Sequence, residues 1–253
     1  MTNRNRLEEI RKYLSQNQTV GIAEVSQLFN ISIATARRDL DQLAENGEVM
    51  RVRGGARLAI KAPPEPPVRQ RCNDQSDEKF RIARMAADLV QTGETLLLGG
   101  GSTVYEMARQ LNERSDITVV TNSLLVINAL SSNREMQLVT LGGFFRPSEL
   151  VSFGHITEAT LTDLYVDKVF FGVRAISIER GLTNDYITEL STDRMILNRG
   201  KEIIVLADHT KFNRESTTLV GPLSVVHKII TDDKAPKETI EAIQALGIEV
   251  LIA

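Results

Sequence analysis

The chain has 253 residues, 42% of them hydrophobic and 25% charged, which is enough to bury the core of one or two domains. A single cysteine excludes an intramolecular disulfide and a cysteine-based zinc site, and we expect no metal and no cofactor. The first residues lack the apolar core of a signal peptide, and no apolar run approaches the roughly 20 residues of a membrane span. We therefore expect a cytoplasmic protein that does not bind membranes.

Charge and proline both divide the chain near residue 61. Residues 1–61 hold ten lysines and arginines against seven acids, a net charge of +3, which leaves −6 for the rest. The segment KAPPEPPVRQR (residues 61–71) holds four of the seven prolines, and proline disfavours both helix and central strand. We predict a first domain at residues 1–60, an extended linker at 61–72 and a second domain at 73–253. The alternative is a surface loop within one domain.

In the first domain, the spacing of apolar residues predicts helices at residues 4–16, 23–29 and 32–44. Val20 and Ile22 suggest a short extended segment between the first two. The side chains expected to face inward are Leu7, Ile10, Leu14, Val25, Leu28, Phe29, Ala36, Leu40 and Leu43.

Local signals mark the ends of these helices. Asn30 tolerates the left-handed conformation that ends a helix, and Gly47 is a typical helix stop. Ser32 is a favourable cap for the third helix, with its hydroxyl accepting a hydrogen bond from the amide of Thr35 or its neighbour. Two helices joined by a tight turn form a helix-turn-helix, in which the start of the second helix enters the major groove of DNA.

A basic hairpin is expected after the third helix, because Gly54-Gly55 is a turn signal between runs that favour strands. An arginine pair such as Arg37-Arg38 is by itself usually a solvated surface. Here it lies on the second helix of the motif and is followed by a basic wing, so we predict double-stranded operator DNA as a partner. Which of the two arginines contacts bases stays open. The predicted DNA-binding residues are Ser32, Ile33, Thr35, Arg37, Arg38, Arg51, Arg53 and Arg57.

The second domain opens with an amphipathic helix at residues 76–91, capped by Ser76. A buried strand at 96–98, three glycines at 99–101 and a helix from Ser102 then follow. This order is typical of an anion site, because glycine lets backbone amides approach a ligand and the helix N-terminus favours negative charge. The sequence matches neither a Walker loop nor a dinucleotide-binding fingerprint. The alternative is a structural turn.

Further apolar runs alternate with helices, which predicts a parallel sheet covered on both faces. Ligands bind outside the carboxyl ends of such strands, and the runs here end in polar residues. The runs are ITVVTNS, MQLVTLGG, KVFFGVR, EIIVLADHTKF and KIITDD, and their ends include Asn122, Gly143, Arg174, Asp208, Lys211 and Asp232.

The segment TARRDLDQLAENGEVMRVRGGA resembles the N-terminal signature of the DeoR family of bacterial transcriptional regulators. Ala36 stands where the family usually has isoleucine, and Arg53 where it has histidine. The later segments TNSL, LGG, FFGV, GLT and DHTKF are similar to landmarks of its effector domain. The resemblance implies an α/β fold class: a winged helix-turn-helix followed by a Rossmann-like, parallel-sheet domain of the ribose-5-phosphate isomerase and glucosamine-6-phosphate deaminase type.

The resemblance also implies a repressor of a carbohydrate-utilisation operon whose DNA binding responds to a phosphorylated sugar or a sugar-derived metabolite. A homodimer or homotetramer is implied as well. The phosphate is placed on the glycine loop and the sugar beside the ends of the strands. The expected effector-binding residues are Lys79, Gly100, Gly101, Ser102, Thr103, Asn122, Gly143, Arg174, Glu189, Arg194, Asp208 and Lys211.

The chain departs from the family pattern at residues 99–103, at Val173-Arg174 and at Asp193-Arg194, which leaves the identity of the effector open. Arg174 pairs either with a second anionic group of the effector or with a nearby acid such as Glu179.

Two other functions compete with the regulator. One is a phosphosugar isomerase or deaminase, for which Glu189, Asp208 and Lys211 are candidate acid and base groups. The related isomerases carry acids where Val173-Arg174 stands, which argues against turnover, so we expect no enzyme and no catalytic residue. The other is a DNA-binding protein whose second domain only forms oligomers.

Overall fold

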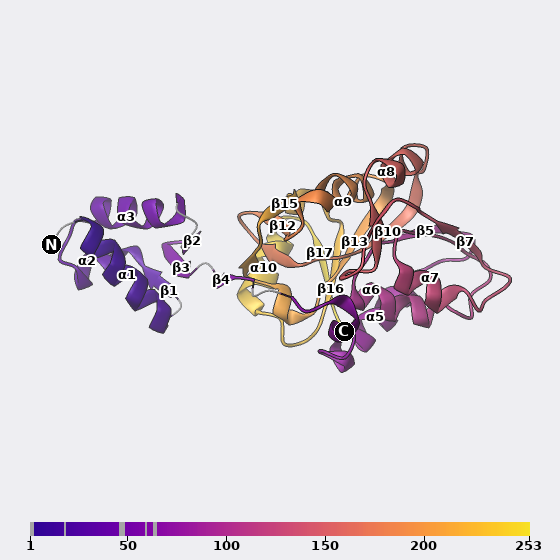
Figure 1. The fold of residues 1–253 in the computed structure, drawn as a ribbon. Coiled ribbons are helices and arrows are strands. Elements are labelled where there is room, and N and C mark those ends of the chain that lie inside the picture. The colour runs from indigo at the N-terminus through magenta and orange to yellow at the C-terminus, as the bar shows by residue number, and fades with distance from the viewer. Residues whose placement is uncertain (1–2, 18, 46–48, 59, 63–64) are drawn as a thin grey trace. The chain divides into compact units, whose positions relative to one another are not determined.

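The computed structural model describes residues 3–17, 19–45, 49–58, 60–62 and 65–253. It divides into two compact units, Met1–Lys61 and Ala62–Ala253 (Figure 1). Gly47, which we expected to end the third helix, lies outside the described residues.

The first unit combines three helices with a small antiparallel sheet in the order β1-β3-β2. The predicted helices and the basic hairpin are confirmed, and the hairpin gains a third strand that pairs Val20 with Ala56. The elements are α1 (Asn3–Asn17), β1 (Thr19–Gly21), α2 (Ile22–Leu28), α3 (Ile33–Glu45), β2 (Val49–Val52), β3 (Gly55–Leu58) and β4 (Ile60–Lys61).

The core of this unit contains the predicted apolar residues with one exception. Leu28 is 51% exposed, so the expectation that it faces inward is wrong. Because α2 already begins at Ile22, its inward stripe runs through Ile22, Val25 and Phe29 at spacings of three and four residues. With 3.6 residues per turn, Leu28 then points roughly a quarter-turn away from that stripe.

Both predicted signals at the turn between α2 and α3 are confirmed. Asn30 has φ of 50°, the left-handed conformation that ends a helix. The amide of Thr35 donates to Ser32 Oγ at 3.1 Å, which satisfies one of the free amides in the first turn of α3.

The second unit is an α/β domain. Its helices are α4 (Val68–Arg71), α5 (Ser76–Asp88), α6 (Ser102–Gln110), α7 (Leu124–Leu130), α8 (His155–Thr162), α9 (Leu190–Leu197) and α10 (Lys237–Ala245), with 3-10 turns η1 (Ile187–Glu189), η2 (His209–Lys211) and η3 (Leu223–Val225). Its strands are β5 (Thr95–Leu98), β6 (Thr118–Thr121), β7 (Gln137–Thr140), β8 (Phe144–Arg146), β9 (Val151–Phe153), β10 (Val166–Gly172), β11 (Ala175–Ser177), β12 (Gly181–Asn184), β13 (Gly200–Leu206), β14 (Arg214–Glu215), β15 (Thr218–Gly221), β16 (Lys228–Thr231) and β17 (Glu249–Ile252).

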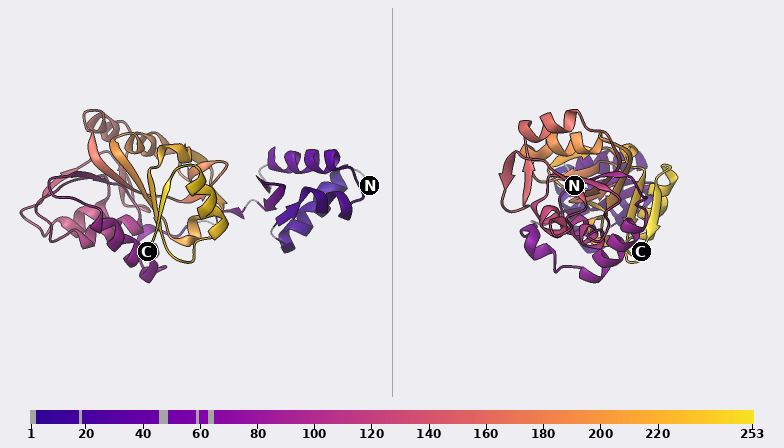
Figure 2. Two further views of the ribbon diagram at one scale, coloured as in Figure 1. Left: turned by 180° about the vertical axis from the view of Figure 1, so that it is seen from behind. Right: turned by 90° about the vertical axis from the view of Figure 1, so that its right-hand side faces the viewer.

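Seven of these strands form a parallel sheet in the order β17-β16-β13-β10-β5-β6-β7. Successive side chains of a strand point to opposite faces. Leu97 accordingly packs in the core beneath α8, α9 and α10, whereas its neighbours Leu96 and Leu98 pack beneath α5, α6 and α7. Figures 1 and 2 show helices on both sides of the sheet. The predicted fold class, a helix-turn-helix followed by a parallel-sheet α/β domain, is confirmed.

Two smaller antiparallel units accompany the main sheet, and the sequence did not suggest them. The first is a sheet in the order β11-β12-β15, and the second is the hairpin β8-β9. Each contributes polar side chains to the site described below. Within the described residues, no helix is both long enough and apolar enough to cross a membrane.

Two local expectations for the second unit are wrong. Ser76 is the first residue of α5 rather than its cap, because the preceding Gln75 has φ of 51° and makes the turn. The linker was expected to stay extended to residue 72, but α4 begins at Val68. Val68 is fully buried beside Leu125 and Leu150, and this burial orders the chain after the prolines.

Candidate functional site

One face of α3 is exposed and polar. Ala36, Leu40 and Leu43 on its opposite face are fully buried, whereas Arg37 and Arg38 are exposed. The arginines therefore project away from the core and are available to phosphates or base edges.

The start of the same helix carries the other predicted groups. Ser32 is exposed, Thr35 is half-buried, and Ile33 is 57% exposed. An apolar side chain in water at this position suits contact with a thymine methyl in the major groove.

The arginines of the hairpin differ in their surroundings. Arg53 is exposed in the turn, and Arg57 on β3 is half-buried. Arg51 donates to the carbonyl of Gly55 at 2.8 Å, and its Nε lies 2.9 Å from Asp41 Oδ1. Arg51 therefore also holds the hairpin against α3.

Asp39 is a structural residue of this surface that the sequence reading missed. It is buried, and it accepts a hydrogen bond from Arg6 Nη2 at 2.9 Å. The sequence did contain one indication of this role: Asp39 directly precedes Leu40, on the buried side of the helix that presents Arg37 and Arg38. The acid fixes α3 to α1 and so orients the arginine pair.

In the second unit, the glycine loop between β5 and α6 is held very close to neighbouring chain. A side chain at Gly100 would lie 2.6 Å from Val151 Cγ1, and one at Gly172 would lie 2.7 Å from the carbonyl oxygen of Gly100. Gly101 has φ of 116°, which favours glycine. No side chain caps α6, so its N-terminus, with buried Ser102 and Thr103, retains amides for an anion.

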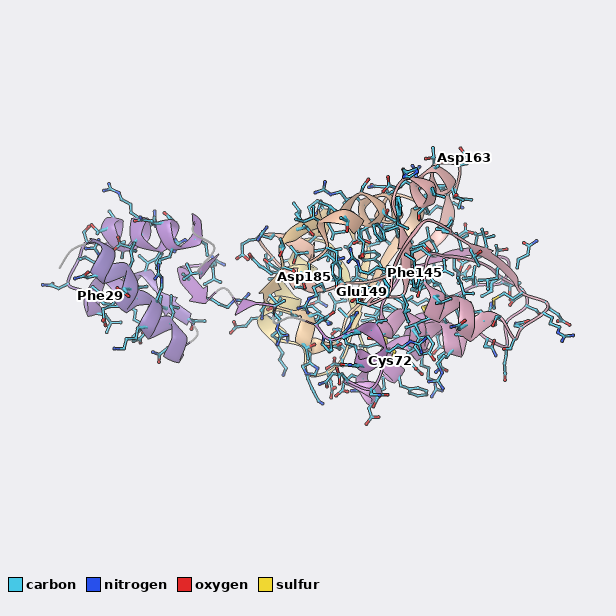
Figure 3. The ribbon with its side chains drawn as sticks, in the orientation of Figure 1. Phe29, Cys72, Phe145, Glu149, Asp163 and Asp185 are labelled. Atoms are coloured by element: carbon cyan, nitrogen blue, oxygen red, sulfur yellow. The ribbon has the colours of Figure 1, made fainter. Side chains whose placement is uncertain are left out.

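This loop forms part of a polar pocket at the carboxyl ends of the strands. Most of the predicted effector-binding residues line it: Gly100, Gly101, Ser102, Thr103, Asn122, Arg174, Glu189 and Lys211. The pocket also contains residues that the sequence did not indicate as a site, among them Glu65, Arg71, Glu149, Asn184, Asp185, Tyr186 and Asp193. Figure 3 labels Glu149 and Asp185.

Lys79 and Arg194 do not line this pocket, contrary to expectation. Lys79 donates to the carbonyls of Arg71 and Asp74, and its burial lowers the pKa of its ammonium group. It lines a neighbouring cavity that also includes Ser102. Arg194 points to another surface, where it donates to the carbonyl of Leu219 at 2.7 Å.

Gly143 and Asp208 also lie outside the pocket. A side chain at Gly143 would lie 2.2 Å from Thr157 Oγ1, so this glycine serves packing. Asp208 is buried and accepts from the amide of Thr210 at 2.9 Å, which caps η2. Its effect on the pocket is to position the turn that carries Lys211.

Arg174 pairs with acidic residues, but the structure does not show the pair with Glu179 that the sequence suggested. Its Nη1 lies 2.8 Å from Glu65 Oε1, and its Nε donates to Asp185 Oδ2 at 2.8 Å. Glu179 instead accepts a long hydrogen bond from Ser177. Tertiary folding thus brings Glu65 to an arginine more than a hundred residues away in the sequence.

The other end of the pocket is acidic. Burial raises the pKa of Glu149 and of Glu189, and it raises the pKa of Asp193 to about 7. Asn184 opposes that shift by donating to Asp193 Oδ2 at 2.7 Å. Arg146 pairs with Glu189. Carboxyl groups beside an anion loop suit a ligand with hydroxyl groups at one end and negative charge at the other.

These features define a class of protein: a helix-turn-helix that exposes arginines, joined to an α/β domain with a polar pocket at the carboxyl ends of its strands. Family comparison agrees with it. The DeoR-like helix-turn-helix domain matches residues 6–61, and the DeoR C-terminal sensor domain matches residues 74–233. The chain belongs to the DeoR family of transcriptional regulators, as its sequence signature predicted.

Relatives are similar over more than nine-tenths of their length. The chain is 31% identical to a putative aga operon transcriptional repressor of Escherichia coli O157:H7, over 98% of this chain and 93% of that one. It is 31% identical to the HTH-type transcriptional repressor GlcR of Bacillus subtilis, over 100% and 97%. It is 33% identical to the lactose phosphotransferase system repressor of Streptococcus mutans, over 92% and 93%.

Solved structures are less similar. Ribose 5-phosphate isomerase A from Methanocaldococcus jannaschii matches with a TM-score of 0.41 and 21% identity, covering 55% of each chain.

The family and its members are transcriptional regulators, so the chain is a regulator and not an enzyme.

Proposed function

We propose that this protein represses a carbohydrate-utilisation operon, and that a phosphorylated sugar or sugar-derived metabolite in the pocket changes its affinity for operator DNA. The observation that carries the proposal is the pocket itself, where the uncapped start of α6 meets Arg174 and Lys211. The names of relatives support the operon class, since they include repressors of the aga operon and of a lactose phosphotransferase system.

In the proposed complex, the phosphate lies on the backbone amides and hydroxyls of residues 100–103. Asn122 and Glu189 exchange hydrogen bonds with the hydroxyl groups of the sugar. Arg174 and Lys211 add positive charge. No cofactor besides the effector is required.

DNA and effector must influence each other's binding equally, because the coupling is thermodynamic. We propose that the effector releases the operator, and that the protein acts in the cytoplasm as a homodimer or homotetramer. Paired helix-turn-helix units on a two-fold axis match a palindromic operator.

The decisive experiment is fluorescence anisotropy with DNA from upstream of the protein's own gene. Binding is measured alone and with a panel of sugar phosphates, each beside its unphosphorylated sugar as the matched control. Release by one phosphorylated compound, and not by its sugar, supports the proposal. Tight DNA binding that no member of the panel changes would contradict the assigned effector class and leave the DNA-binding role intact.

A further inference from the structure

Glu65, from the proline-rich segment, places its carboxylate inside the pocket. Arg71 Nη1 lies 2.7 Å from Glu65 Oε2, Arg174 Nη1 lies 2.8 Å from Glu65 Oε1, and Lys211 pairs with the same Oε1. All of these side chains are mostly buried. Cations from α4, from the loop after β10 and from η2 thus converge on one acid.

Such a cluster needs a negative charge at its centre. Moving a cation out of water is unfavourable unless an opposite charge accompanies it. Arg174 also pairs with Asp185 and Arg71 also pairs with Glu149, whereas the ion pair that the described structure gives Lys211 is the one with Glu65. When Glu65 leaves, another anion is therefore strongly favoured in its place.

The cluster and the glycine loop belong to the same pocket. Glu65, Arg174 and Lys211 line it together with Gly101 and Ser102. The pocket thus has one anion position at the start of α6 and a second position that a side chain of the protein already fills. A ligand with two acidic groups matches both positions.

We propose that Glu65 is a tethered anion that occupies the subsite for a second acidic group of the effector. The effector is then a sugar phosphate that bears a further carboxylate or phosphate, and its binding displaces Glu65. This inference rests on the proposed function of the glycine loop.

Displacement of Glu65 also connects the pocket to the DNA-binding unit along the chain. Glu65 lies only a few residues after Lys61, where that unit ends. Because the carboxylate and the ligand compete, the effector's apparent affinity falls with the fraction of protein in which Glu65 is bound. By the same linkage, the effector releases the segment that leads into the DNA-binding unit.

Inorganic phosphate is a suitable first probe, because it competes for an anion subsite whatever sugar the pocket prefers. Titration calorimetry compares the full-length protein with Glu65→Gln, which keeps the shape of the side chain and removes its charge. We expect phosphate to bind Glu65→Gln about tenfold more tightly. The matched control Glu202→Gln, which removes the charge facing Lys228 at 3.0 Å outside the pocket, should keep wild-type affinity.

Two further variants test whether the gain arises at the cluster. Adding Arg174→Gln to Glu65→Gln should abolish it. Glu65→Asp keeps the charge on a shorter side chain, so it should fold even where Glu65→Gln does not, with a phosphate affinity between wild type and Glu65→Gln. Equal phosphate affinity in wild type and the Glu65 variants, or no binding to any of them, would overturn the proposal.

Ligand chemistry identifies the second acid. Glucose 6-phosphate has a phosphate only, 6-phosphogluconate adds a carboxylate, and fructose 1,6-bisphosphate adds a phosphate. The gain in affinity caused by Glu65→Gln should be larger for one of the doubly acidic ligands than for glucose 6-phosphate. Equal gains for all three, or no gain, contradict a second subsite.

Ser102→Asp distinguishes a failure of this inference from a failure of the proposed function. If the glycine loop does not hold the effector's phosphate, Ser102→Asp leaves the sugar-phosphate response of DNA binding unchanged, while the gain from Glu65→Gln persists. If Glu65 is not a displaced anion, Ser102→Asp blocks the response as expected, but Glu65→Gln gives no gain.

Discussion

Arg6 and Asp39 join two helices of the DNA-binding unit through a hydrogen-bonded ion pair, with Arg6 Nη2 2.9 Å from Asp39 Oδ1. The carboxylate is almost completely buried, with 4% of its side chain exposed. A buried charge without its partner is costly, so this pair is a sensitive point of the unit.

Asp39→Asn should lower the free energy of unfolding of the DNA-binding unit by about 2 kcal/mol or more, because it weakens a buried charge-assisted hydrogen bond. Urea unfolding followed by circular dichroism measures the change. Asp41→Asn is the matched control: Asp41 is half exposed on the same helix and pairs with Arg51. Its effect should stay within about 0.5 kcal/mol. Equal effects of the two variants would remove the special role of Asp39.

Arg37→Ala and Arg38→Ala should both weaken operator binding without changing the fold, since both side chains are exposed on α3. A lost base contact contributes roughly 1–3 kcal/mol and reduces discrimination against a mutated operator. A lost phosphate contact weakens binding to all DNA and lowers the salt slope by about 0.9.

Anisotropy at several salt concentrations, on operator and scrambled DNA, therefore separates the two roles. Arg84→Ala, an exposed arginine on α5 of the second unit, is the control and should bind DNA as wild type does. If Arg37→Ala and Arg38→Ala also match wild type, α3 is not the recognition helix.

Ser102→Asp should prevent the effector from releasing DNA while leaving DNA binding itself intact. Ser102 is buried at the start of α6, so a carboxylate there repels a phosphate at short distance. The measurement is the effector concentration needed for half-release of operator DNA. Ser131→Asp, on the exposed end of α7, is the control. A normal response in Ser102→Asp would exclude this loop from the effector site.

Asp193 predicts an unusual dependence of stability on pH. Its pKa is raised to about 7 by burial, so between about pH 4 and pH 7 the folded protein retains a proton that the unfolded chain has lost. This group therefore stabilises the fold relatively more at pH 4, and its contribution declines as pH rises to 7, by up to about 4 kcal/mol.

Asp193→Asn removes this titration and should flatten the pH profile, with a gain in stability above pH 7. Urea unfolding at pH 5, 6, 7 and 8 gives the profile. Asp163→Asn at the exposed end of α8 is the control and should leave the slope unchanged (Figure 3). A wild-type slope in Asp193→Asn would mean that this carboxyl is ionised throughout the range.

Several elements followed from the sequence because their causes are local. Ser32 caps α3 and Asn30 ends α2 through contacts within a few residues. The apolar run at Leu96–Leu98 predicted a buried strand, since it lacks the polar alternation of a strand with one face in water. The family signature in residues 35–56 identified the class of regulator.

The composition of the pocket depended on the tertiary structure, because it joins residues that are distant in the chain. Parallel strand order brings residues 100–103 beside Arg174, a neighbourhood that the strand ends suggested. The direction of each long side chain was not predictable, since Lys79 and Arg194 find backbone carbonyls outside the pocket.

The linker shows most clearly which features follow from the local sequence and which depend on the tertiary structure. Its prolines predicted an extended chain between two domains, and local sterics suffice for that conclusion. That Glu65 enters the pocket was decided by the burial of Val68 and by cations from three separate elements. Sequence patterns report which conformations a segment favours, whereas only the folded chain determines which charges meet.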